Sequence, residues 1–180
     1  MSDDRDKEQG IQPWQRRVFE VLQTGDVVHV GYVPDGGHKG LIALCRGAPE
    51  IGTTVLTTEE EGVGLAAGLW LGGKRSVLLM QSSGVGNCIN TFALIEACRF
   101  PLILIVTMRG EFAEYIPFQI PMGKRTPDIL SVMGFDVYRA DIADEIADIV
   151  SGAVDQAFYS NRAVAVLLSQ RMIGRKNWSK

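Results

Sequence analysis

The segment "LILIVT" (102–107) is apolar at five consecutive positions and ends in a threonine. A strand with one face in water alternates apolar and polar side chains, whereas a strand covered on both faces is apolar throughout. The segments "SVLLMQ" (76–81) and "AVAVLLS" (163–169) have a similar composition. These three segments therefore predict the buried centre of a parallel sheet.

The segments on either side complete an alternation of strands and helices. Further strands are predicted at 27–33, 52–57 and 136–140. Helices are predicted at 13–23, 37–47, 59–71, 86–99, 127–134 and 142–159. Such alternation is typical of an α/β domain. We expect an open, mostly parallel six-stranded sheet with helices on both faces, formed by residues 13–172 between polar tails at 1–12 and 173–180.

Local signals set some of these boundaries. The segment 142–159 is apolar at helical spacing, and Asp141 is placed to cap it. Thr126 followed by Pro127 is a favourable start for the preceding helix. The region 109–125 contains two prolines and has no clean period, so we expect a long functional or mobile loop there.

Composition narrows the classes of function. The chain has 180 residues, of which 46% are hydrophobic, and a net charge of −3, which argues against nucleic acid as a partner. No apolar run approaches the roughly 18 residues of a membrane span. The polar start "MSDDRDKEQG" is neither a secretory signal nor a transit peptide. Three cysteines without CxxC spacing indicate neither a disulfide framework nor a zinc site, so we expect a cytoplasmic protein with no metal ligands of its own.

The candidate site is expected beyond the C-terminal ends of the strands, where open parallel sheets bind ligands. Four polar or glycine-rich stretches follow predicted strands: "PDGGH" (34–38), "TEEEG" (58–62), "SSGVGN" (82–87) and "RGEFAEY" (109–115).

The stretch "TTEEEGVGLAAG" (57–68) joins an acidic helix start to a run of small residues. Thr58 and Glu61 fit a capping box, and acids in a first turn each stabilise a helix by about 0.3–1 kcal/mol. The three glycines that follow each cost a helix on the order of 0.8–1 kcal/mol relative to alanine. Capping does not explain this cost, so we expect a ligand or another backbone to approach closely here.

Two partial nucleotide motifs leave an alternative open. The segment "GLWLGGKR" (68–75) lacks the Ser or Thr of a phosphate-binding loop and follows a helix instead of a strand. The segment "GVGLAA" (62–67) is part of a dinucleotide fingerprint, but three glutamates precede it. A nucleotide- or flavin-binding module is therefore the alternative hypothesis.

Four motifs in order carry a resemblance to one family: "YVPDGG" (32–37), "TEEEGVGLAAG" (58–68), "LLMQSSGVGN" (78–87) and "IPMGKRTPDIL" (120–130). The chain resembles the pyrimidine-binding domain of thiamine-diphosphate-dependent 2-oxo acid decarboxylases over about residues 13–170. Within that group it is similar to sulfopyruvate decarboxylase alpha subunits and to phosphonopyruvate decarboxylases.

The resemblance implies roles for residues around the cofactor. Glu59, which lies nine residues before Gly68, would hydrogen-bond a ring nitrogen of the aminopyrimidine and stabilise the imino tautomer that removes the thiazolium proton. The pyrimidine side of the pocket would be lined by Gln81, Ser82, Ser83, Gly84 and Asn87. An ordinary turn capped by Ser83 is the alternative for this segment.

The resemblance also implies residues for the substrate. Asp35 and His38 are candidates for proton handling, with Asp35 and Gly36 next to the substrate. Arg109 and Lys124 could bind an anionic tail such as a sulfonate or phosphonate. As alternatives, His38 could be structural and the two cations could be solvated loop charges.

A second subunit is implied as well. In this superfamily a separate α/β domain with a Gly-Asp-Gly…Asn motif holds magnesium and the diphosphate, and this sequence has no such motif. The resemblance therefore implies a hetero-oligomer in which a beta subunit holds most of the thiamine diphosphate and its Mg²⁺. A non-catalytic subunit with the same fold is the remaining alternative.

Overall fold

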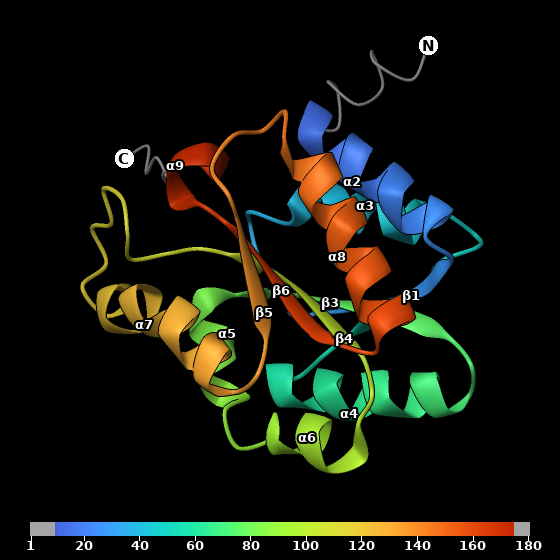
Figure 1. Ribbon diagram of the computed structural model, residues 1–180. Helices are drawn as coiled ribbons and strands as arrows, with labels where there is room; N and C mark the ends of the chain where they lie inside the picture. Colours follow the sequence, from blue (N-terminus) through green and yellow to red (C-terminus); the bar gives the residue numbers. More distant parts are fainter. Residues whose placement is uncertain (1–9, 175–180) are drawn as a thin grey trace.

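A computed structural model describes residues 10–174 and shows a sheet between two layers of helices (Figure 1). The strands are β1 (Val27–Tyr32), β2 (Gly52–Val55), β3 (Arg75–Gln81), β4 (Leu102–Thr107), β5 (Asp136–Ala140) and β6 (Ala163–Leu168). Their spatial order is β2-β1-β3-β4-β6-β5, and every neighbouring pair is parallel. The predicted open six-stranded sheet is confirmed, and its pairing is parallel throughout.

The middle of the sheet consists of the strands with continuous apolar sequence. Every residue of β4 and β6 is buried, as are the five central residues of β3. Side chains alternate between the faces, so that Leu79 and Ile105 belong to one hydrophobic cluster and Leu78 and Leu104 to the other. Both faces must therefore be covered by helices, which explains the lack of polar alternation.

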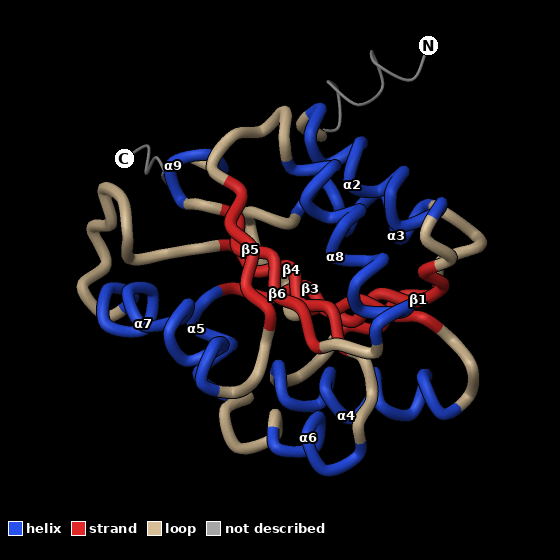
Figure 2. The backbone as a smooth tube through the Cα atoms, in the orientation of Figure 1, coloured by secondary structure: helices blue, strands red, loops and turns tan. Residues whose placement is uncertain are grey.

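A different set of helices covers each face of the sheet (Figure 2). One face packs against α2 (Pro13–Thr24), α3 (Lys39–Gly47) and α8 (Ile146–Ser160). The other carries α4 (Glu59–Leu71), α5 (Ser82–Asn87), α6 (Ala93–Cys98) and α7 (Gln119–Val132). A short helix, α9 (Gln170–Ile173), follows β6. None of the described helices is long and apolar enough to cross a membrane.

The prediction of one helix at 86–99 is wrong, because the chain forms two short helices in this region. α5 begins at Ser82, directly after β3, and the chain turns before α6 starts at Ala93. The intervening turn buries Phe92, whose ring meets Phe135 edge-on at a centroid distance of 4.8 Å. A single continuous helix was predicted because a run of apolar residues does not reveal such a turn.

The predicted start of the helix at 127–134 is also wrong. α7 begins at Gln119 and continues through Pro127, so that the proline lies inside the helix instead of at its first position. A proline there removes one backbone hydrogen bond. The predicted loop at 109–125 is consequently shorter, and residues 108–118 connect β4 to α7.

Two predicted caps are not formed. α8 begins at Ile146, and Asp141 instead pairs with Arg139 at 3.0 Å. Thr58 is the N-cap of α4, but its buried hydroxyl has no partner among the described residues. Glu61 folds back as expected of a capping box, although its Oε2 accepts the amide of Thr57 at 2.8 Å instead of that of Thr58.

The expected tails fall largely outside the described residues. α2 begins at Pro13 as predicted, yet Ile11 just before it is already buried in the core. The packing of the chain therefore begins before the predicted boundary. At the other end, α9 includes Ile173.

Candidate cofactor and substrate site

Three strands bring polar side chains together at the C-terminal edge of the sheet. The carboxylate of Asp35, after β1, accepts a hydrogen bond from the hydroxyl of Thr107 at 2.7 Å. It also accepts the side-chain amide of Gln81, at the end of β3, at 3.2 Å and the backbone amide of Gly37 at 3.0 Å. This cluster lies where neighbouring connections leave the sheet in opposite directions, which is the usual ligand position in such folds.

Asp35 is held as a carboxylate. Burial acts to raise its pKa, but the hydrogen bonds from Thr107, Gln81 and Gly37 favour the ionised form, and the pKa is lowered from its usual value. A negative charge therefore stays in this part of the site at neutral pH.

The segment after β3 extends the polar network. The hydroxyl of Ser83 donates to Oε1 of Gln81 at 2.9 Å, while Nε2 of Gln81 donates to Asp35. These contacts fix both ends of the Gln81 amide. Ser82 is fully buried, and its Oγ accepts the amide of Arg109 at 3.1 Å. Ser82 therefore ties the ends of β3 and β4 together without facing a cavity.

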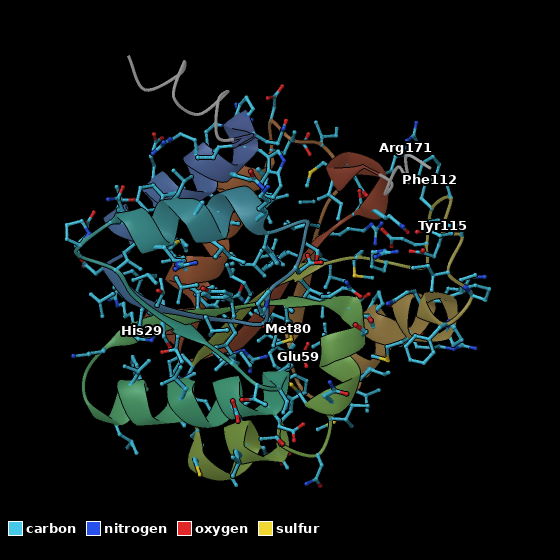
Figure 3. The ribbon with its side chains drawn as sticks, turned by 180° about the vertical axis from the view of Figure 1, so that it is seen from behind. His29, Glu59, Met80, Phe112, Tyr115 and Arg171 are labelled. Atoms are coloured by element: carbon cyan, nitrogen blue, oxygen red, sulfur yellow. The ribbon has the colours of Figure 1, made fainter. Side chains whose placement is uncertain are left out.

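Glu59 is the first residue of α4, and only 8% of it is exposed (Figure 3). Its Oε2 accepts the side-chain amide of Asn87 at 2.8 Å. Its Oε1 accepts no hydrogen bond from a described residue and rests against Gly84. A mostly buried carboxyl group with one unengaged oxygen fits the ring nitrogen of an aminopyrimidine.

The residues around Glu59 are small or chemically inert. A Cβ at Gly62 would lie 2.9 Å from Leu56 and 3.0 Å from Leu78, so this glycine lets α4 pack closely on the sheet. Around Gly64 and Gly68, in contrast, a Cβ would meet nothing within 4 Å. Nearby, burial and the negative charges of Glu59 and Glu60 raise the pKa of the Cys88 thiol to about 12. That thiol is not a nucleophile at neutral pH.

His38 lies in the core instead of the site. It is fully buried, and its Nε2 lies 3.0 Å from the carbonyl of Ile105 and 3.3 Å from that of Met80. Burial lowers its pKa, which keeps the imidazole neutral. This placement favours the structural alternative for His38, and its role in proton handling stays a prediction. His29 likewise packs in the sheet, where Nε2 contacts the hydroxyl of Thr54 at 2.9 Å.

Arg109 is buried but its guanidinium is already engaged. It forms two hydrogen bonds with Glu114, Nε to Oε2 at 2.6 Å and Nη2 to Oε1 at 2.7 Å. The side chains of the pair are 7% and 2% exposed. Lys124 lies exposed on α7, in no ion pair among the described residues. The backbone of Arg109 packs against Gly123, next to Lys124, and the anion-binding role of the two cations stays a prediction.

The loop after β4 is fixed by a residue that sequence reasoning missed. Gln170, in α9, accepts the amides of Glu111 and Phe112 at 3.1 and 3.0 Å, and its Nε2 donates to Glu114 at 2.9 Å. No pattern in the sequence links a glutamine after β6 to a loop after β4. The aromatic side chains of Phe112 and Tyr115 point outward from this anchored loop, on a side of the molecule away from Glu59 (Figure 3).

A cavity of about 230 Å³ opens beside Asp35. Its walls are Asp35, Gly36, Gly37, Thr107, Arg109, Ile173 and Gly174. Asp35 and Gly36, both predicted next to the substrate, thus face one space, whereas Glu59 is not in its wall. Among residues 10–174, no cluster of three His, Cys, Asp or Glu side chains could hold a metal ion.

Comparison with known proteins identifies the family. The chain is 32% identical over 152 residues to the sulfopyruvate decarboxylase subunit alpha of Methanococcus maripaludis, covering 84% of this chain and 91% of that subunit. The chain belongs to the family of sulfopyruvate decarboxylase alpha subunits. The resemblance of its four motifs is thereby confirmed, although no family model matches the sequence. Members of this family are named as subunits of decarboxylases, which are carboxy-lyases.

Two further relatives are similar in sequence to this chain. A sulfopyruvate decarboxylase of Methanosarcina acetivorans is 31% identical over 160 residues, which are 88% of this chain and 40% of that protein. A phosphonopyruvate decarboxylase of Streptomyces viridochromogenes is 38% identical over 108 residues, which are 59% of this chain and 27% of that protein. Both proteins are considerably longer than the segment they share with this sulfopyruvate decarboxylase alpha-subunit homologue.

Solved structures share its fold. A 2-oxoglutarate:ferredoxin oxidoreductase from Magnetococcus marinus matches with a TM-score of 0.69 at 11% identity, covering 93% of this chain and 33% of that one. A protein from Mycobacterium smegmatis assigned as a thiamin diphosphate-dependent enzyme matches with a TM-score of 0.68 at 14% identity, covering 88% and 30%. The chain thus corresponds to about a third of each protein. The likeness shows that this chain has the same fold as the matching part of these two proteins.

Proposed function

We propose that this chain is the alpha subunit of a two-subunit thiamine-diphosphate-dependent decarboxylase that acts on a small anionic 2-oxo acid. Family membership supports the reaction class. The single observation that carries the mechanism is Glu59, a mostly buried carboxyl group at the start of α4 with one oxygen held by Asn87 and the other unengaged.

Glu59 has the chemistry needed for the aminopyrimidine. When bound, thiamine diphosphate supplies an electron sink for the carbanion left by decarboxylation. The unengaged Oε1 of Glu59 would hydrogen-bond the pyrimidine ring and share a proton with it. Gln81, Ser83 and Gly84 would line the space beside the ring, with Gln81 fixed by Ser83 and Asp35.

Asp35 is the second chemical group of the proposed site. Its carboxylate and the backbone at Gly36 face the 230 Å³ cavity, and the carboxylate is ionised at neutral pH. We assign it to proton handling and orientation near the substrate. A substrate with a sulfonate or phosphonate tail fits the names of the relatives. Arg109, however, is paired with Glu114. This arginine can bind such a tail only if its ion pair with Glu114 opens.

The proposed partner is a beta subunit that holds the diphosphate and Mg²⁺. The relative from Methanosarcina acetivorans supports this, because the likeness covers only 40% of that longer protein. A hetero-oligomer in the cytoplasm fits the chain, whose three cysteines are free.

The test is reconstitution with the beta subunit, thiamine diphosphate and Mg²⁺, followed by 2-oxo acid decarboxylation. Glu59→Gln is expected to lower kcat by on the order of 10²-fold or more, because an amide cannot share the proton. Glu60→Gln, which changes the exposed neighbouring acid, is the matched control and keeps wild-type turnover. Near-wild-type turnover of Glu59→Gln, with the complex intact, would indicate a non-catalytic subunit.

The nucleotide-binding alternative is not favoured. The glycines of "GVGLAA" (62–67) lie inside α4. In "GLWLGGKR" (68–75), Gly68 also lies inside α4, and Gly72 and Gly73 lie between α4 and β3. A phosphate loop requires the opposite order, from strand to helix.

A further inference from the structure

The carboxyl group of Glu59 is held by two residues of α5. Gly84 lies against one side of it, and Asn87 donates to its Oε2 at 2.8 Å. Both belong to the helix Ser82–Asn87, which packs on α7 and follows directly from β3. The sequence motif "SSGVGN" (82–87) therefore contacts the acid itself, whereas the resemblance implied only a lining for the cofactor.

Gly84 is needed for space and not for its backbone conformation. Its φ is not positive, since the described glycines with positive φ are Gly10, Gly73, Gly110, Gly134 and Gly174. A Cβ at Gly84, however, would overlap Cγ, Cδ and Oε1 of Glu59. The obstructing atoms are the functional end of Glu59. Any side chain at this position must therefore displace the carboxyl group.

Asn87 fixes Oε2, the other carboxylate oxygen of Glu59. Its Nδ2 is a neutral donor, so the hydrogen bond orients Oε2 without placing a counter-charge beside it. With Oε2 engaged and Gly84 beside Oε1, rotation of the carboxyl group would break the bond to Asn87 or collide with α5. Oε1 accepts no hydrogen bond from a described residue and keeps its full capacity for a new one.

We propose that Asn87 and Gly84 are positioning residues that hold Glu59 with Oε1 presented to the aminopyrimidine. The role of Oε1 rests on the proposed function, whereas the hold on Glu59 is a property of this chain alone. Asn87, implied by the resemblance as a cofactor ligand, acts through Glu59 instead.

The first experiment uses the full chain without partner or cofactor. In the NMR spectrum, the side-chain amide protons of Asn87 should resonate downfield of those of Asn90, which is exposed like Asn87 but whose side-chain amide donates to no described residue. Glu59→Ala should abolish this difference, and Glu60→Ala should preserve it. If the Asn87 amide of the wild-type chain resembles that of Asn90, the hydrogen bond and the proposal are both wrong.

Gly84→Ala tests the packing contact by the same signal. Its added methyl group should displace Glu59 and shift the Asn87 amide toward the position of Asn90. Gly64→Ala is the matched control, because a Cβ there meets nothing within 4 Å. An unchanged Asn87 signal in folded Gly84→Ala would contradict the proposed contact, and the Asn87 variants decide the proposal if this variant does not fold.

The second experiment measures exchange of the reactive thiazolium proton with solvent in the reconstituted complex. Asn87→Ala should slow exchange by on the order of tenfold, since a hydrogen bond to a charged group is lost. Asn87→Asp has the same shape but replaces the donor by a negative charge, so exchange should be slower still. Asn90→Ala should exchange at the wild-type rate.

The order of the exchange rates of Asn87→Ala and Asn87→Asp distinguishes a positioning role of Asn87 from a packing role. If Asn87 only fills space, Asn87→Asp will resemble the wild type and Asn87→Ala will be the poorer variant, which would overturn the proposal. If Glu59→Gln itself exchanges at the wild-type rate, the proposed function fails, while the NMR result still decides whether Asn87 and Gly84 hold Glu59.

Discussion

His38 is the residue type expected of a proton carrier, but its imidazole lies between two strands. Nε2 contacts backbone carbonyls of β3 and β4, and Nδ1 is buried without a partner among the described residues. A protonated ring would place a charge in the core. Its burial therefore links His38 to the pH dependence of stability and not to the reaction.

We predict that the chain loses stability below about pH 6.5 because of His38. Burial lowers the pKa of folded His38, so the unfolded chain takes up a proton that the folded chain does not. The stabilising contribution is complete above the unfolded pKa. It is lost as the pH falls toward the folded pKa, by at most about 1.4 kcal/mol for each pH unit.

Denaturant unfolding of the wild type and His38→Gln at pH 7 and pH 5.5 measures this contribution. The variant should be less stable at pH 7 but lose less on acidification. His29→Gln, at the less buried histidine, is the control and should keep most of the wild-type pH dependence. Equal losses in the wild type and His38→Gln would show that His38 is not responsible.

The buried polar residues also show what the sequence can predict about the site. Asp35, Gln81 and Glu59 could be predicted as site residues because each stands at a strand end or helix start in a recognisable motif. Thr107 and Gln170 were missed because their roles depend on partners at Asp35 and in the loop after β4. Arg109 was found but misread, since nothing in its sequence neighbourhood indicates that Glu114 binds it first.

At the scale of elements, the loop at 109–118 is anchored more firmly than its sequence suggests. Besides the Arg109–Glu114 pair, Glu111 contacts Arg139 at 2.8 Å and accepts the amide of Gln170 at 2.8 Å. The hydrogen bond from Arg109 lowers the pKa of Glu114 to about 2, against the effect of burial. The pair is thus intact at neutral pH and is lost as the pH falls from about 4.5 toward 2.

We predict that Glu114→Gln destabilises the chain by about 3–5 kcal/mol, because it leaves a buried arginine without its counter-charge. Denaturant unfolding at pH 7 measures the change, and limited proteolysis should locate new cleavage within 109–118. Asp144→Asn removes the exposed partner of Arg17 and serves as the control, with an expected cost below about 1 kcal/mol. A loss that small in Glu114→Gln would mean that the loop is not anchored by this pair.

The elements that were predicted well are those specified by burial on both faces. Continuous apolar runs located the central strands β3, β4 and β6 to within a residue, because a central parallel strand has no polar position. The helices that were mispredicted depend on tertiary contacts. Phe92 turns the chain between α5 and α6, and α7 tolerates Pro127, neither of which local propensity reveals.

For the whole molecule, α4 presents an open face that residues 10–174 do not cover. Gly64 and Gly68 are exposed, and a methyl group added at either position would meet nothing within 4 Å, in contrast to Gly62 on the inner face. Glycines on an exposed helix face do not help this chain to fold. They suit close contact with a second subunit.

We predict that Gly68→Phe leaves the isolated chain as stable as the wild type or slightly more stable, yet weakens assembly with the beta subunit at least tenfold. Thermal unfolding measures the first effect and sedimentation velocity the second. Gly152→Ala, at another glycine with no neighbour within 4 Å, is the control and should assemble normally. Normal assembly of Gly68→Phe would exclude this face from the contact.

The two ends of the described chain lie close together. Gly10 and Ile173 line the same cavity of about 470 Å³, which shares Gly36 and Gly37 with the cavity beside Asp35. The described part of the chain therefore begins and ends beside the site. Tethering a partner there would convert a bimolecular encounter into an intramolecular one, with an effective concentration on the order of millimolar for a short flexible linker. Gene fusion is thus a geometrically simple route from a two-chain enzyme to a single-chain one.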